Sequence, residues 1–299
     1  MVPETSQRQI RSALITVQVL FGINYLASKL IISAMTPGAW AAMRTGSAFL
    51  VLLAIVLIGR LPLPSRRDIG LLAVGAFFGI VLNQGLFLEG LARTTVSRSA
   101  LICSQIPTFV LLFSVISKQE KLSWIKGISF FAGITGVLVL LKVDRFQMDG
   151  QYLAGDLMTL ANAASFGLFV VISRRIMARN NPWAATAVVF FFGSLGMMVY
   201  GGRDLFHTDF SLLSPGLVVA IVYVILGATV VTYYLNLWAI KRVQATRVAM
   251  YIFLQPVVAS ILGIVFRDEV ITVRFLVATG LIFLALALRD GRPKALSGS

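Results

Sequence analysis

The sequence predicts an all-α membrane protein with ten transmembrane helices, arranged as two inverted five-helix repeats around a central cavity. Three observations lead to this prediction: the composition, the spacing of apolar runs, and a similarity between the two halves of the chain. Of 299 residues, 58% are hydrophobic and 13% are charged, whereas a soluble domain carries about 25% charged residues. Long apolar runs separated by short basic clusters are typical of membrane spans joined by short loops.

Each span needs about 20 mainly apolar residues to cross the hydrocarbon core of a bilayer. Breaks such as Pro37-Gly38 and the polar stretch 93–98 separate neighbouring runs. The first run lacks a short apolar core followed by a small-residue cleavage site, so we expect a retained span and not a signal peptide. The ten predicted spans are 12–34, 38–58, 68–91, 98–117, 124–141, 155–178, 184–201, 214–239, 247–266 and 272–288.

The charges of the loops predict the orientation of these spans. In the ten-span order, one side of the membrane carries 17 Lys and Arg residues and the other carries 7. The positive-inside rule therefore predicts a multi-pass protein of the cell inner membrane with both termini in the cytoplasm. The same bias accounts for the net charge of +14 without a nucleic-acid partner, because the basic residues form small groups and no basic domain.

The residues offer no candidate for catalysis, for a metal or for a cofactor. Cys103 is the single cysteine and lies in an apolar run, while His207 is the single histidine and lies in a polar loop. Neither has neighbours at metal-ligand spacing, and the chain has no glycine-rich nucleotide motif and no nucleophile with a base. The expected partners are a small-molecule substrate and the lipid bilayer. The oligomeric state stays open, and a monomer is compatible with the sequence.

The two halves, residues 1–147 and 148–299, resemble each other in sequence and predict a duplication. Because each half holds five spans, an odd number, the second half must enter the membrane from the opposite side. Such inverted repeats are typical of secondary transporters, whose substrate site lies at the repeat interface. At a separation of 149 residues the matches are Arg93 with Arg242, Arg98 with Arg247, Pro107 with Pro256 and Glu120 with Glu269, and at 145 they include Phe21-Gly22 with Phe166-Gly167 and Pro37 with Pro182.

One stretch resembles a known family. Residues 91–141 read LARTTVSRSALICSQIPTFVLLFSVISKQEKLSWIKGISFFAGITGVLVLL. This resembles the end of an EamA-type repeat, with a small-residue turn, a span with a central proline, an interfacial Glu and a Gly-rich last span. Residues 237–288 resemble the same pattern, and Arg44 in AAMRTGSAF resembles the arginine of that family's second span.

The resemblance covers nearly the whole chain as two copies. It implies the drug/metabolite transporter superfamily, ten helices and, often, export of amino acids or other small metabolites. Two features depart from the family pattern. Lys118-Gln119 precedes Glu120 where the family usually has an apolar-Gly pair, and the second repeat lacks an arginine that matches Arg44.

Polar residues inside the spans predict where the substrate binds. Polar groups in lipid are costly and usually face protein or a cavity. Hydrogen bonding between helices is the alternative for any one of them, but as a set they gather on the first, third, fourth, sixth, eighth and ninth spans. The predicted substrate-binding residues are Asn24, Tyr25, Asn83, Gln84, Ser104, Gln105, Asn162, Tyr234, Tyr251 and Gln255.

Charged and proline residues within the spans allow further predictions. Arg44 lies about one turn inside its span, where snorkelling to the interface is favoured over a role as an anchor for a substrate carboxylate. Pro107 and Pro256 are predicted to kink the fourth and ninth helices, with curvature alone as the alternative. Glu89 is predicted to pair with Arg93 four residues later and not to carry protons.

Together these features predict an alternating-access transporter that exports amino acids and related small metabolites. An exporter of drugs or other organic solutes and cations is the alternative within the same class. A non-transport membrane protein such as a lipid scramblase is less favoured, because it would not need an inverted repeat around polar spans.

Overall fold

The computed structural model describes residues 7–94, 102–140 and 150–258, together with isolated positions between 99 and 284. The described residues form helices, turns and loops and no strand, which confirms the all-α prediction. Within these described ranges, six helices are long and apolar enough to cross a membrane, so the chain is a multi-pass membrane protein. They are α1 (Gln7–Ile31), α2 (Pro37–Ile58), the continuous helix Arg66–Arg93, the apolar stretch Leu153–Met177 of α8 (Gly150–Met177), α9 (Pro182–Phe206) and the continuous helix Pro215–Ile240.

Shorter helices occupy three further predicted spans. α6 (Ile106–Ile116) lies in the fourth, α7 (Trp124–Leu140) in the fifth, and α12 (Ala245–Met250) with the 3₁₀ turn η5 (Tyr251–Phe253) in the ninth. A second 3₁₀ turn, η3 (Phe210–Leu212), lies in the loop after α9. Most of the tenth predicted span, 272–288, falls outside the described residues.

The starts of four helices follow directly from local sequence. Thr36 and Asn181 cap α2 and α9 through their side chains, and each is followed by a proline in the first helical turn. Ser65 and Ser214 cap the helices that begin at Arg66 and Pro215 in the same way. A capping side chain satisfies one of the free backbone N–H groups, and proline suits the first turn because its missing N–H needs no partner there.

Two helices change winding in the middle of the bundle. Arg66–Arg93 consists of α3 (Arg66–Ala76), the π-helix η1 (Phe77–Leu82) and α4 (Asn83–Arg93). Pro215–Ile240 consists of α10 (Pro215–Ile225), the π-helix η4 (Leu226–Val231) and α11 (Thr232–Ile240). A π-helix shifts the backbone hydrogen bonds by one residue and is frequent at functional sites.

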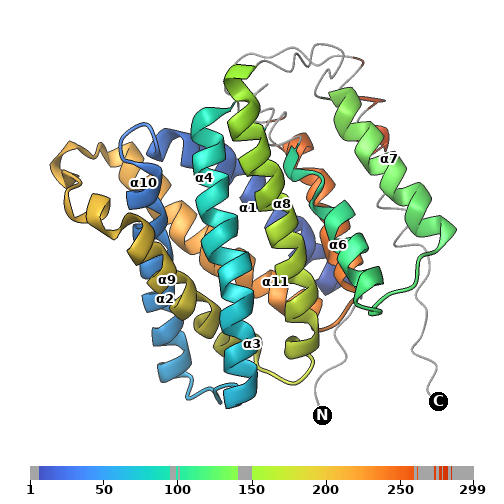
Figure 1. Cartoon of the computed structure of the whole chain (residues 1–299), viewed down its shortest axis with the longest axis horizontal. Coiled ribbons are helices and arrows are strands. Elements are labelled where there is room, and N and C mark those ends of the chain that lie inside the picture. Colours follow the sequence, from blue (N-terminus) through green and yellow to red (C-terminus); the bar gives the residue numbers. More distant parts are fainter. Residues whose placement is uncertain are drawn as a thin grey trace.

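Pairs of long helices pack side by side to form the bundle (Figure 1). α2 lies along α9, α4 along α8, and α1 crosses α10 and α11. α2 and α9 come close together at the glycines Gly38 and Gly201, where a side chain on Gly201 would overlap the backbone carbonyl of Gly38. α6 packs on α8 and α12, so segments from both halves of the chain are in contact there.

Hydrogen bonds tie the loops together at two opposite ends of the bundle. At one end, the lower end in Figure 1, are the loops that join α2 to α3 and α8 to α9. This end includes the ion pair of Arg179 with Asp68, the bond from Lys241 to the carbonyl of Asn180, and the bonds from Thr246 to Glu120. At the other end Glu89 pairs with Arg93, as predicted, and accepts a bond from Tyr200.

Candidate functional site

A cavity of about 680 Å³ lies between the helices, counting its opening. Residues from α1, α2, α4, α6, α8, α11, α12 and η5 line it, together with Cys103 before α6 and Gln255 after η5. Its wall mixes amides, phenols and aromatic rings with one guanidinium. The residues that line it are Gln18, Phe21, Asn24, Tyr25, Arg44, Asn83, Gln84, Phe87, Cys103, Ile106, Asn162, Phe166, Val170, Tyr233, Asn236, Val248, Ala249, Ile252 and Gln255.

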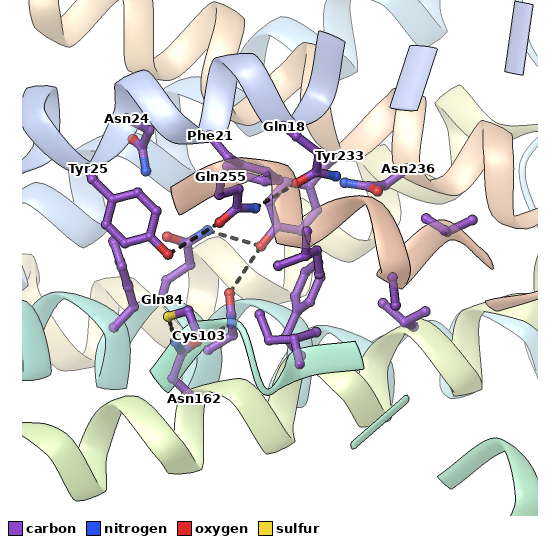
Figure 2. A pocket seen from close by; sticks show the side chains of 18 of the residues that line it. Gln18, Phe21, Asn24, Tyr25, Gln84, Cys103, Asn162, Tyr233, Asn236 and Gln255 are labelled. Atoms are coloured by element: carbon purple, nitrogen blue, oxygen red, sulfur yellow. Dashed lines mark hydrogen bonds between the residues drawn. The ribbon is translucent and has the colours of Figure 1, made fainter. Parts of the chain in front are cut away.

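One hydrogen-bonded group joins α1 to the segment after η5. The Gln255 amide donates to Gln18 Oε1 at 2.7 Å, and the Tyr25 hydroxyl donates to Gln255 Oε1 at 3.3 Å. Figure 2 shows these three side chains in a row along one wall of the cavity. Each of them is at least 94% buried, so the amides depend on one another or on a ligand for partners.

A second group is centred on the hydroxyl of Tyr233. This hydroxyl accepts from Gln84 Nε2 at 3.0 Å and lies 2.8 Å from the carbonyl of Gly79, to which it donates. Gly79 belongs to η1, so the tyrosine satisfies a carbonyl in a segment that departs from α-helical bonding. Asn83 donates to Asn162, whose own amide donates to Cys103 Sγ at 3.4 Å.

Aromatic rings form the apolar part of the wall. Tyr25 and Phe87 meet edge to face with their ring centroids 5.5 Å apart. Phe166 meets Tyr233 in the same manner at 6.4 Å. Rings of this kind offer faces to an apolar or cationic group, while the amides above offer donors and acceptors.

Arg44 is the charged residue among those that line the cavity. Its side chain is 1% exposed, so the favoured expectation that it snorkels to the membrane interface is wrong. Nε donates to Thr229 Oγ1 at 2.6 Å and one terminal nitrogen, Nη2, donates to the carbonyl of Ala228 at 3.2 Å. Both acceptors belong to η4, which lies across from α2 and draws the guanidinium inward.

Six of the ten predicted binding residues line this cavity, and Arg44 joins them. Ser104, Gln105, Tyr234 and Tyr251 do not line it. Tyr234 instead stacks on Trp183, with ring centroids 3.6 Å apart, and Gln105 accepts a bond from Thr108 in the first turn of α6. Ser104 and Tyr251 are buried away from the cavity wall.

Pro107 and Pro256 lie next to stretches where the backbone is not α-helical. Pro107 stands in the first turn of α6, directly after a turn at Ser104-Gln105. Pro256 follows the 3₁₀ turn η5. The backbone therefore departs from a regular α-helix before both prolines. The first departure lies between the lining residues Cys103 and Ile106, and the second includes the lining residue Ile252.

Several lining residues were missed by sequence reasoning. Tyr233 and Asn236 belong to the polar set of the eighth span, but the neighbouring Tyr234 was selected in their place. Gln18 lies near the start of the first span, where a polar residue reads as interfacial. Phe21, Phe87 and Phe166 carry no polar group and look like ordinary core residues.

The site suits binding and not bond chemistry. Among the described residues, no cluster of three His, Cys, Asp or Glu side chains could hold a metal ion. Of the described residues that line the cavity, none carries a carboxylate. What the cavity wall offers is a mainly apolar surface that carries amide and phenol groups, built from helices far apart in sequence.

The EamA-like transporter family matches residues 11–142 and 153–289 of this chain. The chain belongs to the EamA-like transporter family. It is therefore a membrane transporter of the drug/metabolite transporter superfamily and not an enzyme.

Related proteins agree with this assignment. The chain is 23% identical over 268 residues to the uncharacterized transporter YcxC of Bacillus subtilis, covering 86% of this chain and 85% of that protein. It is 24% identical over 292 residues to the WAT1-related protein At3g02690, chloroplastic, of Arabidopsis thaliana, covering 93% of this chain and 68% of that protein. A solved structure described as "Crystal structure of protein" has the same fold, with a TM-score of 0.75, 20% identity and coverage of 95% of this chain and 97% of that one.

Proposed function

We propose that this EamA-like transporter exports amino acids and related small metabolites across the inner membrane by alternating access. The observation that supports it is a cavity whose polar bonds cross the boundary between the two halves of the chain. Tyr25 bonds to Gln255, Asn83 to Asn162, and Gln84 to Tyr233. A site held by bonds between two repeats changes its access when one repeat rocks against the other.

Internal symmetry supports the inverted-repeat part of the proposal. The family pattern matches the chain twice, once in each half. η1 and η4 begin at Phe77 and Leu226, which are 149 residues apart, and each spans six residues. Gln84 and Tyr233 are separated by the same 149 residues and touch each other. Equivalent positions of a two-fold pair can meet only near the axis, so the axis would pass through the cavity.

Charge placement supports the orientation. The loops that carry Asp68, Arg179, Lys241 and Glu120 gather at one end of the bundle, and these loops belong to the basic side in the ten-span order. With that end in the cytoplasm, the proposal places both termini inside, as the positive-inside rule requires.

Transport into sealed vesicles tests the proposal. We expect purified protein in liposomes to move members of a radiolabelled amino-acid and metabolite panel down their own gradients, with or without a pH gradient. Gln255→Ala and Asn83→Ala should each lower the initial rate at least about tenfold while leaving folding and insertion intact, because each removes an amide from the cavity wall.

Gln7→Ala is the matched control, because Gln7 is an exposed residue at the start of α1 and should transport at the parent rate. If neither cavity variant differs from the parent, the cavity is not the transport path. If organic cations move and amino acids do not, the substrate class is wrong and the transport function stands.

A further inference from the structure

The guanidinium of Arg44 is a buried cation that the described chain leaves without a counter-ion. The ion pairs found among the described residues join Arg93 to Glu89, Lys126 to Glu120 and Arg179 to Asp68. None includes Arg44, and its second terminal nitrogen, Nη1, is buried without a hydrogen-bond partner. A charge removed from water without a partner is strongly destabilising, so its presence calls for a compensating group.

The two groups that accept from Arg44 do not depend on it. The carbonyl of Ala228 also accepts a bond from Thr232 Oγ1 at 2.9 Å. The hydroxyl of Thr229 donates its own proton to the carbonyl of Val224 at 2.7 Å. Both would stay satisfied if the arginine were absent. A purely structural role for Arg44 is therefore poorly supported, since the structure gains two bonds and accepts an uncompensated charge.

Arg44 lies where a bound ligand could neutralise its charge. It lines the cavity together with uncharged amides, phenols and rings, and no Asp or Glu is among the lining residues. Figure 2 shows how closely these amides and phenols gather around one space. Among the described lining residues, the net charge that a ligand in that space meets is the positive charge of Arg44, held where water screens it poorly.

We propose that Arg44 binds an oxyanion of the substrate, in the first instance a carboxylate, and that the cavity consequently excludes organic cations. This rests on the transport function proposed above and narrows its substrate class. A carboxylate accepts charge-assisted hydrogen bonds from a guanidinium and neutralises it, whereas an amine without an acid group adds a second positive charge. A phosphate group has the same chemistry and is distinguished by experiment.

Thermal unfolding of the purified protein in detergent tests the site without knowledge of the natural substrate. The probes are butyrate, 3-phenylpropionate and inorganic phosphate, against butyramide, 3-phenylpropionamide, phenethylamine and chloride at equal ionic strength. We expect the carboxylates to raise the unfolding midpoint on the order of 3 °C at saturating concentration. The amides, the amine and chloride should leave it unchanged.

Arg44→Met separates binding from folding. The variant should unfold at a higher temperature than the parent when no oxyanion is present, because it removes an unpaired buried charge and leaves Ala228 and Thr229 bonded. It should lose the rise caused by carboxylates. Arg203→Met, which removes an exposed arginine, should keep that rise in full. Arg44→Lys retains the charge but not the planar pair of donors and should respond more weakly than the parent.

Each result decides the matter. A rise with phosphate alone keeps the oxyanion site and replaces carboxylate by phosphate. No rise with any oxyanion, an equal rise with phenethylamine, or a full rise in Arg44→Met overturns the proposal. If Arg44→Met does not fold, the ligand comparison in the parent still decides. If Gln255→Ala abolishes solute flux and no oxyanion raises the unfolding midpoint, this inference is rejected and the transport function stands. If oxyanions raise the midpoint through Arg44 and no solute flux is found, this inference stands and the transport function is rejected.

Discussion

The two π-helices occupy matching places in the two halves of the chain and face different surroundings. In η1, a side chain on Gly79 would overlap the ring of Phe169, and Ile80 packs into the space left by Gly193 on α9. In η4, the equivalent residues are Ala228 and Thr229, and they meet the guanidinium of Arg44 on α2. The first π-helix is packed by apolar groups and the second by a charge.

The two π-helices share a backbone feature but differ in the side chains that bind to it. Both π-helices present a carbonyl to a polar side chain at positions 149 residues apart: Gly79 accepts from Tyr233 and Ala228 accepts from Arg44. The shift in backbone bonding thus serves both halves alike. The side chains break the symmetry, because a phenol donates to one carbonyl and a guanidinium donates to the other. A substrate oxyanion bound at Arg44 would therefore occupy one side of the cavity only.

The largest loss of stability is expected when a bulky side chain is added in the apolar contact between η1 and α9. A Cβ atom on Gly193 would lie 2.5 Å from Ile80 Cγ2, closer than real contacts allow. Gly193→Leu should lower the free energy of unfolding by about 3 kcal/mol or more, because η1 must move away from α9. Thermal unfolding in detergent measures the loss. Gly46→Leu on α2 is the control, since a Cβ there meets no atom within 4 Å; an equally large loss in the control would show that the η1 contact is not the cause.

A smaller loss of stability is expected when η4 receives an apolar residue at the position equivalent to Ile80 of η1. Thr229→Val removes the hydroxyl that accepts from Arg44 Nε and leaves a buried charged donor unpaired. The expected loss is about 1–3 kcal/mol. In the Arg44→Met background the same change should cost far less, because no donor remains to be stranded. Additive losses in this double-mutant cycle would mean that the two side chains are not coupled.

The long helices could be predicted from sequence because the bilayer makes hydrophobicity and length decisive. Six predicted spans, among them 38–58 and 184–201, coincide with membrane-length helices whose starts are set by local caps at Thr36 and Asn181. The π-helices were not predicted. Their residues, 77–82 and 226–231, have the composition of ordinary apolar helix. Both segments pack against distant helices, η1 on α8 and α9 and η4 on α1 and α2, and such contacts are not visible in the sequence.

The site was predicted less well because direction around a helix is not visible in a list of polar residues. Tyr233 and Tyr234 are neighbours that point about 100° apart. Tyr233 faces the cavity and Tyr234 faces Trp183. The burial of Arg44 was missed for a similar reason. Its depth near the end of a span suggested an exit to the interface, whereas its acceptors come from a helix more than 180 residues later.

The smallest loss of stability is expected when Tyr233 loses the hydroxyl that donates to η1. Tyr233→Phe keeps the ring against Phe166 and Phe190 but removes the hydroxyl between Gln84 and Gly79. The loss in the free energy of unfolding should be about 1 kcal/mol, the usual net worth of a neutral hydrogen bond. The oxyanion response should persist, because Arg44 on α2 donates to the other π-helix, η4, and bonds to neither Gln84 nor Gly79. Thermal unfolding with and without 3-phenylpropionate measures both quantities. Loss of the response in Tyr233→Phe would show that the two sides of the cavity act as one site and that the difference between η1 and η4 does not divide it.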